Sequence, residues 1–168
     1  MSGPCNEPGA SIVPAGAIVR DFTAADQPAV RALVLAGLAH HWGEVDASLN
    51  PDLDDIAGAY AGGCTLVAEA DGAIVGTGTV VPRDAHTCEI VRMSVAEATR
   101  GRGIGRVLVD VLAQRAAGWG ATRLVLETTA DWHDTVAFYR SCGFEITHYD
   151  DGRFGRDAWF ERPIVGPE

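Results

Sequence analysis

Apolar residues follow two different spacings along the chain, and these spacings predict where strands and helices lie. Strand-like runs cover residues 17–20, 65–70, 73–81, 89–95 and 123–128, and a last pair covers 144–149 and 157–164. Helical spacing covers 23–38, 51–60, 104–118 and 134–142, while residues 40–50 are expected to form a loop or a broken helix. The order is strand, two helices, three strands, helix, strand, helix and two strands, which predicts an α/β fold.

Local signals between these runs agree with the predicted boundaries. Asp71-Gly72 and Asp151-Gly152 are typical of the tight turn of a β-hairpin. Thr23, followed three residues later by Asp26, resembles the capping box that begins a helix. Local sequence and apolar spacing therefore indicate the same elements.

Composition indicates one domain preceded by a tail. The chain has 168 residues, of which 47% are hydrophobic, so we expect a single core within residues 17–168. Residues 1–16 are rich in Pro, Gly and Ser and are predicted to be a flexible tail without the features of a secretory signal. No apolar run reaches membrane-spanning length. Four cysteines without C-x-x-C spacing favour reduced thiols and a cytoplasmic location.

The charge of the chain limits its partners. A formal net charge of −10 opposes binding to nucleic acid or to an anionic membrane, because both require a basic surface. Within this acidic chain, three arginines are concentrated between residues 100 and 106. A local basic cluster of this kind favours a small polyphosphate ligand.

The segment Arg100-Gly101-Arg102-Gly103-Ile104-Gly105-Arg106 stands between a predicted strand and a predicted helix. A helix N-terminus presents free backbone N–H groups and the positive end of the helix dipole, and nearby glycines let an anion approach closely. The segment lacks the Lys-Ser/Thr of a P-loop, and its third glycine comes one residue too early for a dinucleotide fingerprint. The sequence therefore predicts a pyrophosphate site for a different ligand.

Two motifs in the predicted order resemble those of the GNAT superfamily of acetyl-CoA-dependent N-acetyltransferases. Arg100, Gly103 and Gly105 match its first signature, and a strand at 124–129 is followed by a helix with Phe138-Tyr139 and then Gly143-Phe144. The resemblance covers about residues 17–164. It implies a mixed, mostly antiparallel sheet with splayed central strands flanked by helices, and it implies acetyl-CoA as the acyl donor.

The resemblance also implies which residues contact the donor. Backbone groups of Met93, Ser94 and Val95 would pair with the pantetheine arm, and the segment from Arg100 to Arg106 would hold the pyrophosphate. Many relatives have an asparagine seven residues before the tyrosine, whereas this chain has Trp132. Donor contacts from the predicted helix are then expected from Asp134, Phe138 and Arg140.

Transfer of an acetyl group to an amine requires a neutral amine and a proton for the departing thiolate. The resemblance implies Tyr139 as the general acid. The base is predicted to be Glu127 or Glu89, since relatives place a glutamate on either strand, and an unassisted mechanism stays open. Either carboxylate would work better with a pKa raised by burial.

The acceptor is expected to contact the first helices and the segment between them. Five acidic residues and no arginine lie between His40 and Tyr60, which favours a cationic amine. His41, Trp42 and Glu44 are the predicted contacts, together with Trp132 as an aromatic wall. No metal is predicted, because adjacent histidines rarely face one ion.

The sequence thus predicts an N-acetyltransferase that acts on a primary amine of a small molecule or peptide. Two alternatives remain at this stage. One is a non-catalytic domain that binds or senses acyl-CoA, and the other is an acetyltransferase that acts on protein amines. The sequence does not fix the oligomeric state; a homodimer is one possibility, because dimers are common among relatives.

Overall fold

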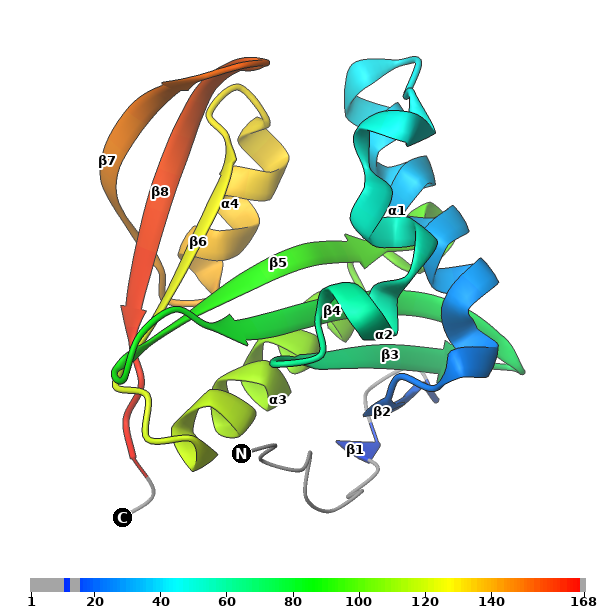
Figure 1. Cartoon of the computed structure of the whole chain (residues 1–168), viewed down its shortest axis with the longest axis horizontal. Helices are drawn as coiled ribbons and strands as arrows, with labels where there is room; N and C mark the ends of the chain where they lie inside the picture. Colours follow the sequence, from blue (N-terminus) through cyan, green and yellow to red (C-terminus); the bar gives the residue numbers. More distant parts are fainter. Residues whose placement is uncertain (1–10, 13–15, 167–168) are drawn as a thin grey trace.

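The computed structural model describes residues 11–12 and 16–166. Its single sheet has the strand order β1-β2-β3-β4-β5-β6-β8-β7 (Figure 1). The strands are β1 (Ser11–Ile12), β2 (Ile18–Asp21), β3 (Cys64–Ala70), β4 (Ala73–Pro82), β5 (Thr87–Val95), β6 (Arg123–Thr129), β7 (Glu145–Gly152) and β8 (Gly155–Pro163). The helices are α1 (Gln27–Trp42), α2 (Ile56–Ala59), α3 (Ile104–Gly118) and α4 (His133–Ser141). The fold is mixed α/β, as the sequence predicts.

The sheet opens into a V between its two central strands, β5 and β6. These strands run parallel, but they pair only at Thr87–Arg123, Cys88–Leu124 and Glu89–Val125. All other neighbouring strands are antiparallel. Beyond the three pairs, β5 continues with β4 while β6 continues with β8 and β7, so the sheet divides into two halves (Figure 1).

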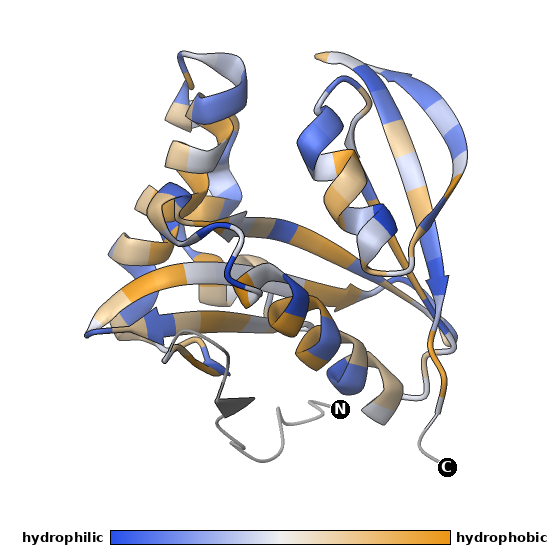
Figure 2. Ribbon diagram, turned by 180° about the vertical axis from the view of Figure 1, so that it is seen from behind, coloured by the Kyte–Doolittle hydropathy of each residue, from blue (hydrophilic) through white to orange (hydrophobic). Residues whose placement is uncertain are grey.

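Helices cover both faces of the sheet, and successive side chains of β3 pack against helices on opposite faces. Leu66 and Ala68 belong to the main core, which also contains the buried side of α3. Val67, which points to the other face, packs with Val30 and Val34 of α1. Apolar and polar positions accordingly alternate along α3, whereas the edge strand β7 is mostly hydrophilic and exposed (Figure 2).

Gly78 of β4 leaves space for side chains of β5 and α3 to pack closely against the β4 backbone. A Cβ atom at this position would lie 2.3 Å from Met93 Sδ and 3.1 Å from Leu112 Cδ1. Met93 occupies this space because β5 has an irregular register opposite Thr77–Thr79 of β4. A side chain at residue 78 would displace Met93, a residue of the candidate site.

The first helix is longer than the sequence predicts, and the second is more broken. His40, His41 and Trp42 form the last turn of α1, which ends at Gly43 with φ +83°. The predicted helix over 51–60 is divided into η3 (Pro51–Asp54) and α2, preceded by the short η2 (Ala47–Leu49). Two further single turns are η1 (Ala24–Asp26), which has the predicted capping box, and η4 (Glu97–Thr99).

The predicted tail lies mostly outside the described residues. Within it, Ser11–Ile12 form the two-residue strand β1, which pairs with β2. Among the described helices, none has the combination of length and apolarity that is required to cross a bilayer.

Candidate active site

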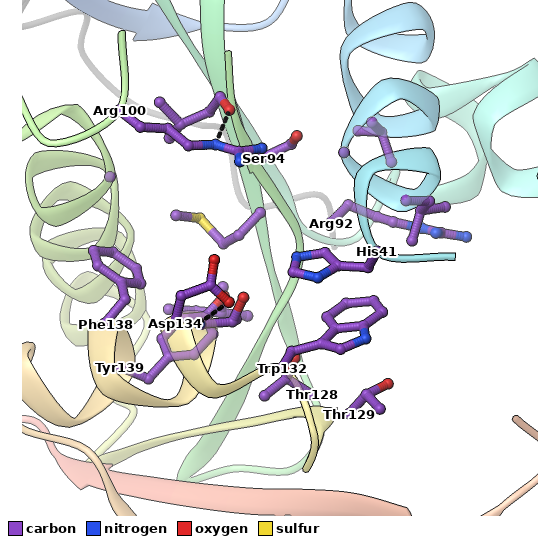
Figure 3. Close-up of a pocket in the computed structure, with 18 of the residues that line it drawn as sticks. His41, Arg92, Ser94, Arg100, Thr128, Thr129, Trp132, Asp134, Phe138 and Tyr139 are labelled. Atoms are coloured by element: carbon purple, nitrogen blue, oxygen red, sulfur yellow. Dashed lines mark hydrogen bonds between the residues drawn. The ribbon is translucent and has the colours of Figure 1, made fainter. Parts of the chain in front are cut away.

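A groove of about 880 Å³ runs through the opening between β5 and β6. It is lined by parts of α1, β5, β6, α4 and the loop before α3. Figure 3 shows Phe138, Tyr139 and Asp134 of α4 on one side and His41 of α1 with Trp132 on the other. The groove brings together most of the predicted site residues, namely His41, Trp42, Glu89, Met93, Ser94, Val95, Arg100, Gly101, Gly103, Ile104, Gly105, Arg106, Glu127, Trp132, Asp134, Phe138 and Tyr139.

Three predicted residues do not line this groove. Arg102 and Arg140 are exposed outside it, and so is Glu44, just beyond the end of α1. The groove instead includes Arg92 and Asp157, which the sequence analysis did not select. Asp157 comes from the final hairpin, and no local motif marks it.

The N-terminus of α3 forms one end of the groove and has the features of an anion-binding site. Gly103 is the N-cap residue with φ +85°, and it offers no side chain to satisfy the first N–H groups of the helix. Gly101 also has a positive φ, +77°, a conformation that glycine adopts without steric cost. Arg100 is oriented by a hydrogen bond from Nε to the Val95 carbonyl, 3.1 Å, and Arg106 donates to Ser141 Oγ at 3.1 Å. These groups fit a diphosphate.

Gly105 lets α3 and α4 meet at this end. A Cβ atom at residue 105 would lie 3.0 Å from Phe138 Cζ and 3.6 Å from Val95 Cγ2. The small residue therefore keeps the Phe138 ring at the groove wall. This contact gives the third glycine of the motif a packing role.

A strained residue shapes the donor side of the groove. Arg92 has φ +55°, which is uncommon for a residue with a side chain, and it lies in the irregular part of β5. Its guanidinium donates to Asp52 twice, Nε–Oδ2 at 2.8 Å and Nη2–Oδ1 at 2.7 Å. The Tyr60 hydroxyl donates to the same carboxylate at 2.6 Å. We call these three side chains the Arg92 clamp.

The clamp holds a charged pair in a partly buried position. Burial of Asp52 acts against its ionisation, but hydrogen bonds from Arg92 and Tyr60 prevail and hold its pKa below the usual range. The clamp therefore connects η3 to the point where β5 bends. From Ile90 to Val95, β5 has no strand beside it on the β6 side, so backbone groups there are available to a ligand.

Tyr139 is a buried phenol at the groove wall. It packs against Phe138, Phe144 and Phe160 at ring-centroid distances of 5.1 to 5.9 Å. Desolvation raises its pKa, so the hydroxyl keeps its proton at neutral pH. Within the described part of the chain its hydroxyl makes no hydrogen bond, so its proton is available to a ligand.

The two candidate glutamates differ in their partners. Glu89 is buried and accepts a hydrogen bond from Arg83 Nε in an ion pair. Glu127 has no hydrogen bond or ion pair among the described residues, and it lines the groove. Desolvation and the nearby carboxylates of Asp157 and Glu89 raise the pKa of Glu127. Glu127 is thus the better placed of the two to accept a proton, because it is unpaired and its pKa is raised.

The part of the groove around His41 and Trp132 is aromatic, and carboxylates line the groove on the β6–β8 face. The rings of His41 and Trp132 stack with centroids 3.9 Å apart and an interplanar angle of 9°. Desolvation lowers the pKa of His41, which favours a neutral imidazole in this stack. Asp157 lies on the same sheet face as Glu127, because it pairs with Thr129 two residues further along β6.

The fold is an α/β sheet divided between two splayed strands, with a groove between them that ends at a glycine-rich helix N-terminus. The model of the acetyltransferase (GNAT) family matches residues 31–144, more than half of the chain, and the chain belongs to this family. It is therefore an acyltransferase, and its acetyl donor is acetyl-CoA.

Known proteins similar to this chain agree with that assignment. The uncharacterized N-acetyltransferase YjgM of Escherichia coli (strain K12) is 29% identical over 153 residues, which cover 86% of this chain and 92% of that protein. A GNAT family acetyltransferase from Staphylococcus aureus Mu50 has a TM-score of 0.79 at 19% identity, covering 89% of this chain and 99% of that chain. A GNAT acetyltransferase from Elizabethkingia anophelis with acetyl-CoA bound has a TM-score of 0.71 at 20% identity, with coverages of 88% and 98%.

The Arg92 clamp generates a prediction about stability and donor binding. Asp52→Asn removes the charge that holds Arg92, so we expect the free energy of unfolding to fall by about 1–3 kcal/mol. We also expect weaker acetyl-CoA binding, because the bend in β5 loses its support. Urea unfolding and isothermal titration calorimetry would measure the two effects.

The control is Asp54→Asn in the same 3₁₀ turn. Asp54 forms an exposed ion pair with Arg31 at 3.3 Å, so its loss should change stability by less than about 1 kcal/mol. Equal effects of the two substitutions would show that the clamp has no special role.

Proposed function

We propose that this protein transfers the acetyl group of acetyl-CoA directly to a primary amine of a small molecule or peptide. The observation that carries the proposal is the convergence of three features in one groove. These are the anion-binding helix N-terminus, a proton donor at Tyr139 and a free carboxylate at Glu127. Such a groove supplies what a ternary complex of donor and amine requires.

The proposed mechanism assigns one proton transfer to each side chain. Bound acetyl-CoA supplies an acetyl group as a thioester. Glu127 takes a proton from the incoming ammonium group, directly or through water, so that the nitrogen lone pair forms the new C–N bond. Tyr139 gives its hydroxyl proton to the sulfur as the C–S bond breaks, and it regains a proton as the amide nitrogen loses one.

The charge of the groove favours a cationic acceptor. Glu127 and Asp157 stand at the end away from the arginines, and neither carboxylate has an ionic partner among the described residues. The pKa of Asp157 is raised by its desolvation and by Asp150. An ammonium group would relieve this repulsion, which supports an amine that arrives protonated.

Two alternatives place the same groove in other roles. A non-catalytic acyl-CoA sensor needs the anion-binding end but has no use for the unpartnered Tyr139 and Glu127. An enzyme that acts on protein amines would use the acidic end for a basic chain segment. A cytoplasmic location and a homodimer stay predictions from the sequence.

The decisive experiment is release of the CoA thiol from acetyl-CoA across a panel of amines. Polyamines, aminoglycosides, amino acids and short peptides would each be compared with a reaction without amine. We expect amine-dependent release, and the preferred length of the acceptor would separate small-molecule from protein acetylation. Release equal to the blank throughout, with normal acetyl-CoA binding, would favour the sensor.

Replacement of the proposed acid should affect catalysis and leave donor binding intact. Tyr139→Phe keeps the ring among its aromatic neighbours and removes only the hydroxyl. We expect kcat to fall on the order of 100-fold, with the Kd for acetyl-CoA nearly unchanged. Tyr149→Phe, at an exposed tyrosine, is the matched control. An unchanged kcat in Tyr139→Phe would exclude this residue as the acid.

The raised pKa of Glu127 predicts a pH dependence. A base works only when deprotonated, so kcat/KM should rise with pH as Glu127 loses its proton, above the range of an ordinary glutamate. Asp157→Asn removes one repelling charge, so this limb of the profile should move to lower pH. Ionisation of the acceptor amine contributes equally in both enzymes.

Two further variants control the pH experiment. Asp151→Asn, in the same hairpin, should leave the profile nearly unchanged, because Asp151 is exposed and is not one of the main groups that shift the pKa of Glu127. Glu127→Gln should remove the rise of kcat/KM with pH that is assigned to this carboxyl group. A limb that persists unchanged in Glu127→Gln would assign it to another group.

A further inference from the structure

Four aromatic side chains meet across the open end of the V. His41 stacks on Trp132, whose indole meets Trp42 at a centroid distance of 5.4 Å and an angle of 70°. Trp42 in turn contacts Phe154 at 5.9 Å and 62°. We call these four side chains the aromatic bridge. Figure 3 shows its central pair, His41 and Trp132, beside the groove.

The bridge connects elements from both halves of the sheet. His41 and Trp42 belong to the last turn of α1, Trp132 immediately precedes α4, and Phe154 lies in the turn between β7 and β8. Figure 1 places the end of α1, the start of α4 and the β7–β8 turn at the open end of the V. Backbone pairing between the halves ends at Glu89–Val125, so side chains make the contact here.

The backbone holds Trp132 in place within the bridge. Its N–H donates to the Thr129 carbonyl at 3.1 Å, and its own carbonyl accepts from the Val136 N–H at 2.9 Å. His41 is fixed by the helix and lies at van der Waals distance from the indole. No substituent can enter between rings that are this close without separating them.

The groove that this pair lines also contains the proposed acid and base. His41, Trp42 and Trp132 line the same cavity as Glu127 and Tyr139. An amine that reacts there must present its nitrogen next to Glu127 while the rest of the molecule passes the rings. The carbon that carries the amine shares this cavity with the rings. A chain with little bulk at that carbon fits the shared space most easily, whereas a branched or ring-bearing carbon brings its bulk against the His41–Trp132 pair.

We propose that the aromatic bridge determines acceptor specificity, admitting primary amines on unbranched carbons and excluding amines branched at that carbon. The proposal rests on the proposed function and deepens it, because it names the shape of the acceptor. Aromatic walls discriminate by size, and a carboxylate beside them retains the cationic nitrogen. Trp132 and His41 are the residues that set the limit.

The test compares two isomeric probes, n-butylamine and tert-butylamine, in the wild-type protein and in Trp132→Ala. Wild type should prefer the unbranched amine by at least about tenfold in kcat/KM, since pocket size discriminates on that scale. Trp132→Ala should reduce this ratio several-fold while the Kd for acetyl-CoA stays unchanged. A purely structural role would lower both rates and leave the ratio intact.

A second probe does not depend on amine turnover. S-methyl-CoA and S-benzyl-CoA carry a small and a large group on the donor sulfur and transfer neither. Wild type should bind the methyl compound more tightly by roughly tenfold, and Trp132→Ala should bring the two Kd values closer. Calorimetry measures both Kd values without amine turnover. This probe therefore distinguishes failure of the specificity proposal from failure of the proposed acetyltransferase activity.

Two further variants complete the design. His41→Ala opens the stack from α1 and should act in the same direction, so the proposal stays testable if Trp132→Ala does not fold. Trp119→Ala removes an indole at the C-terminal end of α3 that does not line the groove, and it should leave both ratios unchanged. Ratios that are unchanged in Trp132→Ala and His41→Ala, or changed equally in Trp119→Ala, would overturn the proposal.

Discussion

The short parallel pairing of β5 with β6 is the constraint on which the rest of the structure depends. Parallel neighbours need a crossover connection, and here α3 supplies it, so its N-terminus follows the end of β5 where the sheet has opened. Because only three residue pairs join the strands, the last part of β5 keeps backbone groups free of β6. A single feature of topology thus places an anion-binding helix end next to a strand edge that can accept an extended ligand. The same opening separates α1 from α4 and creates the space for an acceptor.

Charge is arranged along the groove as two opposite ends within a strongly acidic chain. Arg100 and Arg106 flank the helix N-terminus, whereas Glu127 and Asp157 stand on the β6–β8 face. Two further charged residues of the groove are held in ion pairs, Glu89 with Arg83 and Arg92 with Asp52. This division matters because a paired carboxylate has its charge compensated, whereas an unpaired and partly desolvated carboxylate has a raised pKa. An anionic donor and a cationic acceptor would therefore enter the groove at different ends.

The sequence predicts the order of elements well, because apolar spacing and turn residues are local properties. It also predicts the position of the glycine- and arginine-rich loop before α3, because these residues are adjacent in the chain. It does not find the end of α1, since His40, His41 and Trp42 have no helical apolar pattern and are held there by contacts such as the His41–Trp132 stack. The choice between Glu89 and Glu127 depends on Arg83, and the place of Asp157 depends on β8 pairing with β6. These contacts join residues that are far apart in the sequence, and the spacing of residues along the chain does not predict them.

The segment between α1 and α2 connects the aromatic bridge to the Arg92 clamp along the chain. Arg92 adopts a positive φ where β5 bends, a conformation that a side-chain-bearing residue keeps only when its surroundings hold it. Its partner Asp52 lies in η3, ten residues after Trp42 of the aromatic bridge. A displacement of this short segment would therefore act on Arg92 and on Trp42, so the shape of the groove at β5 and at the end of α1 depends on the same stretch of chain.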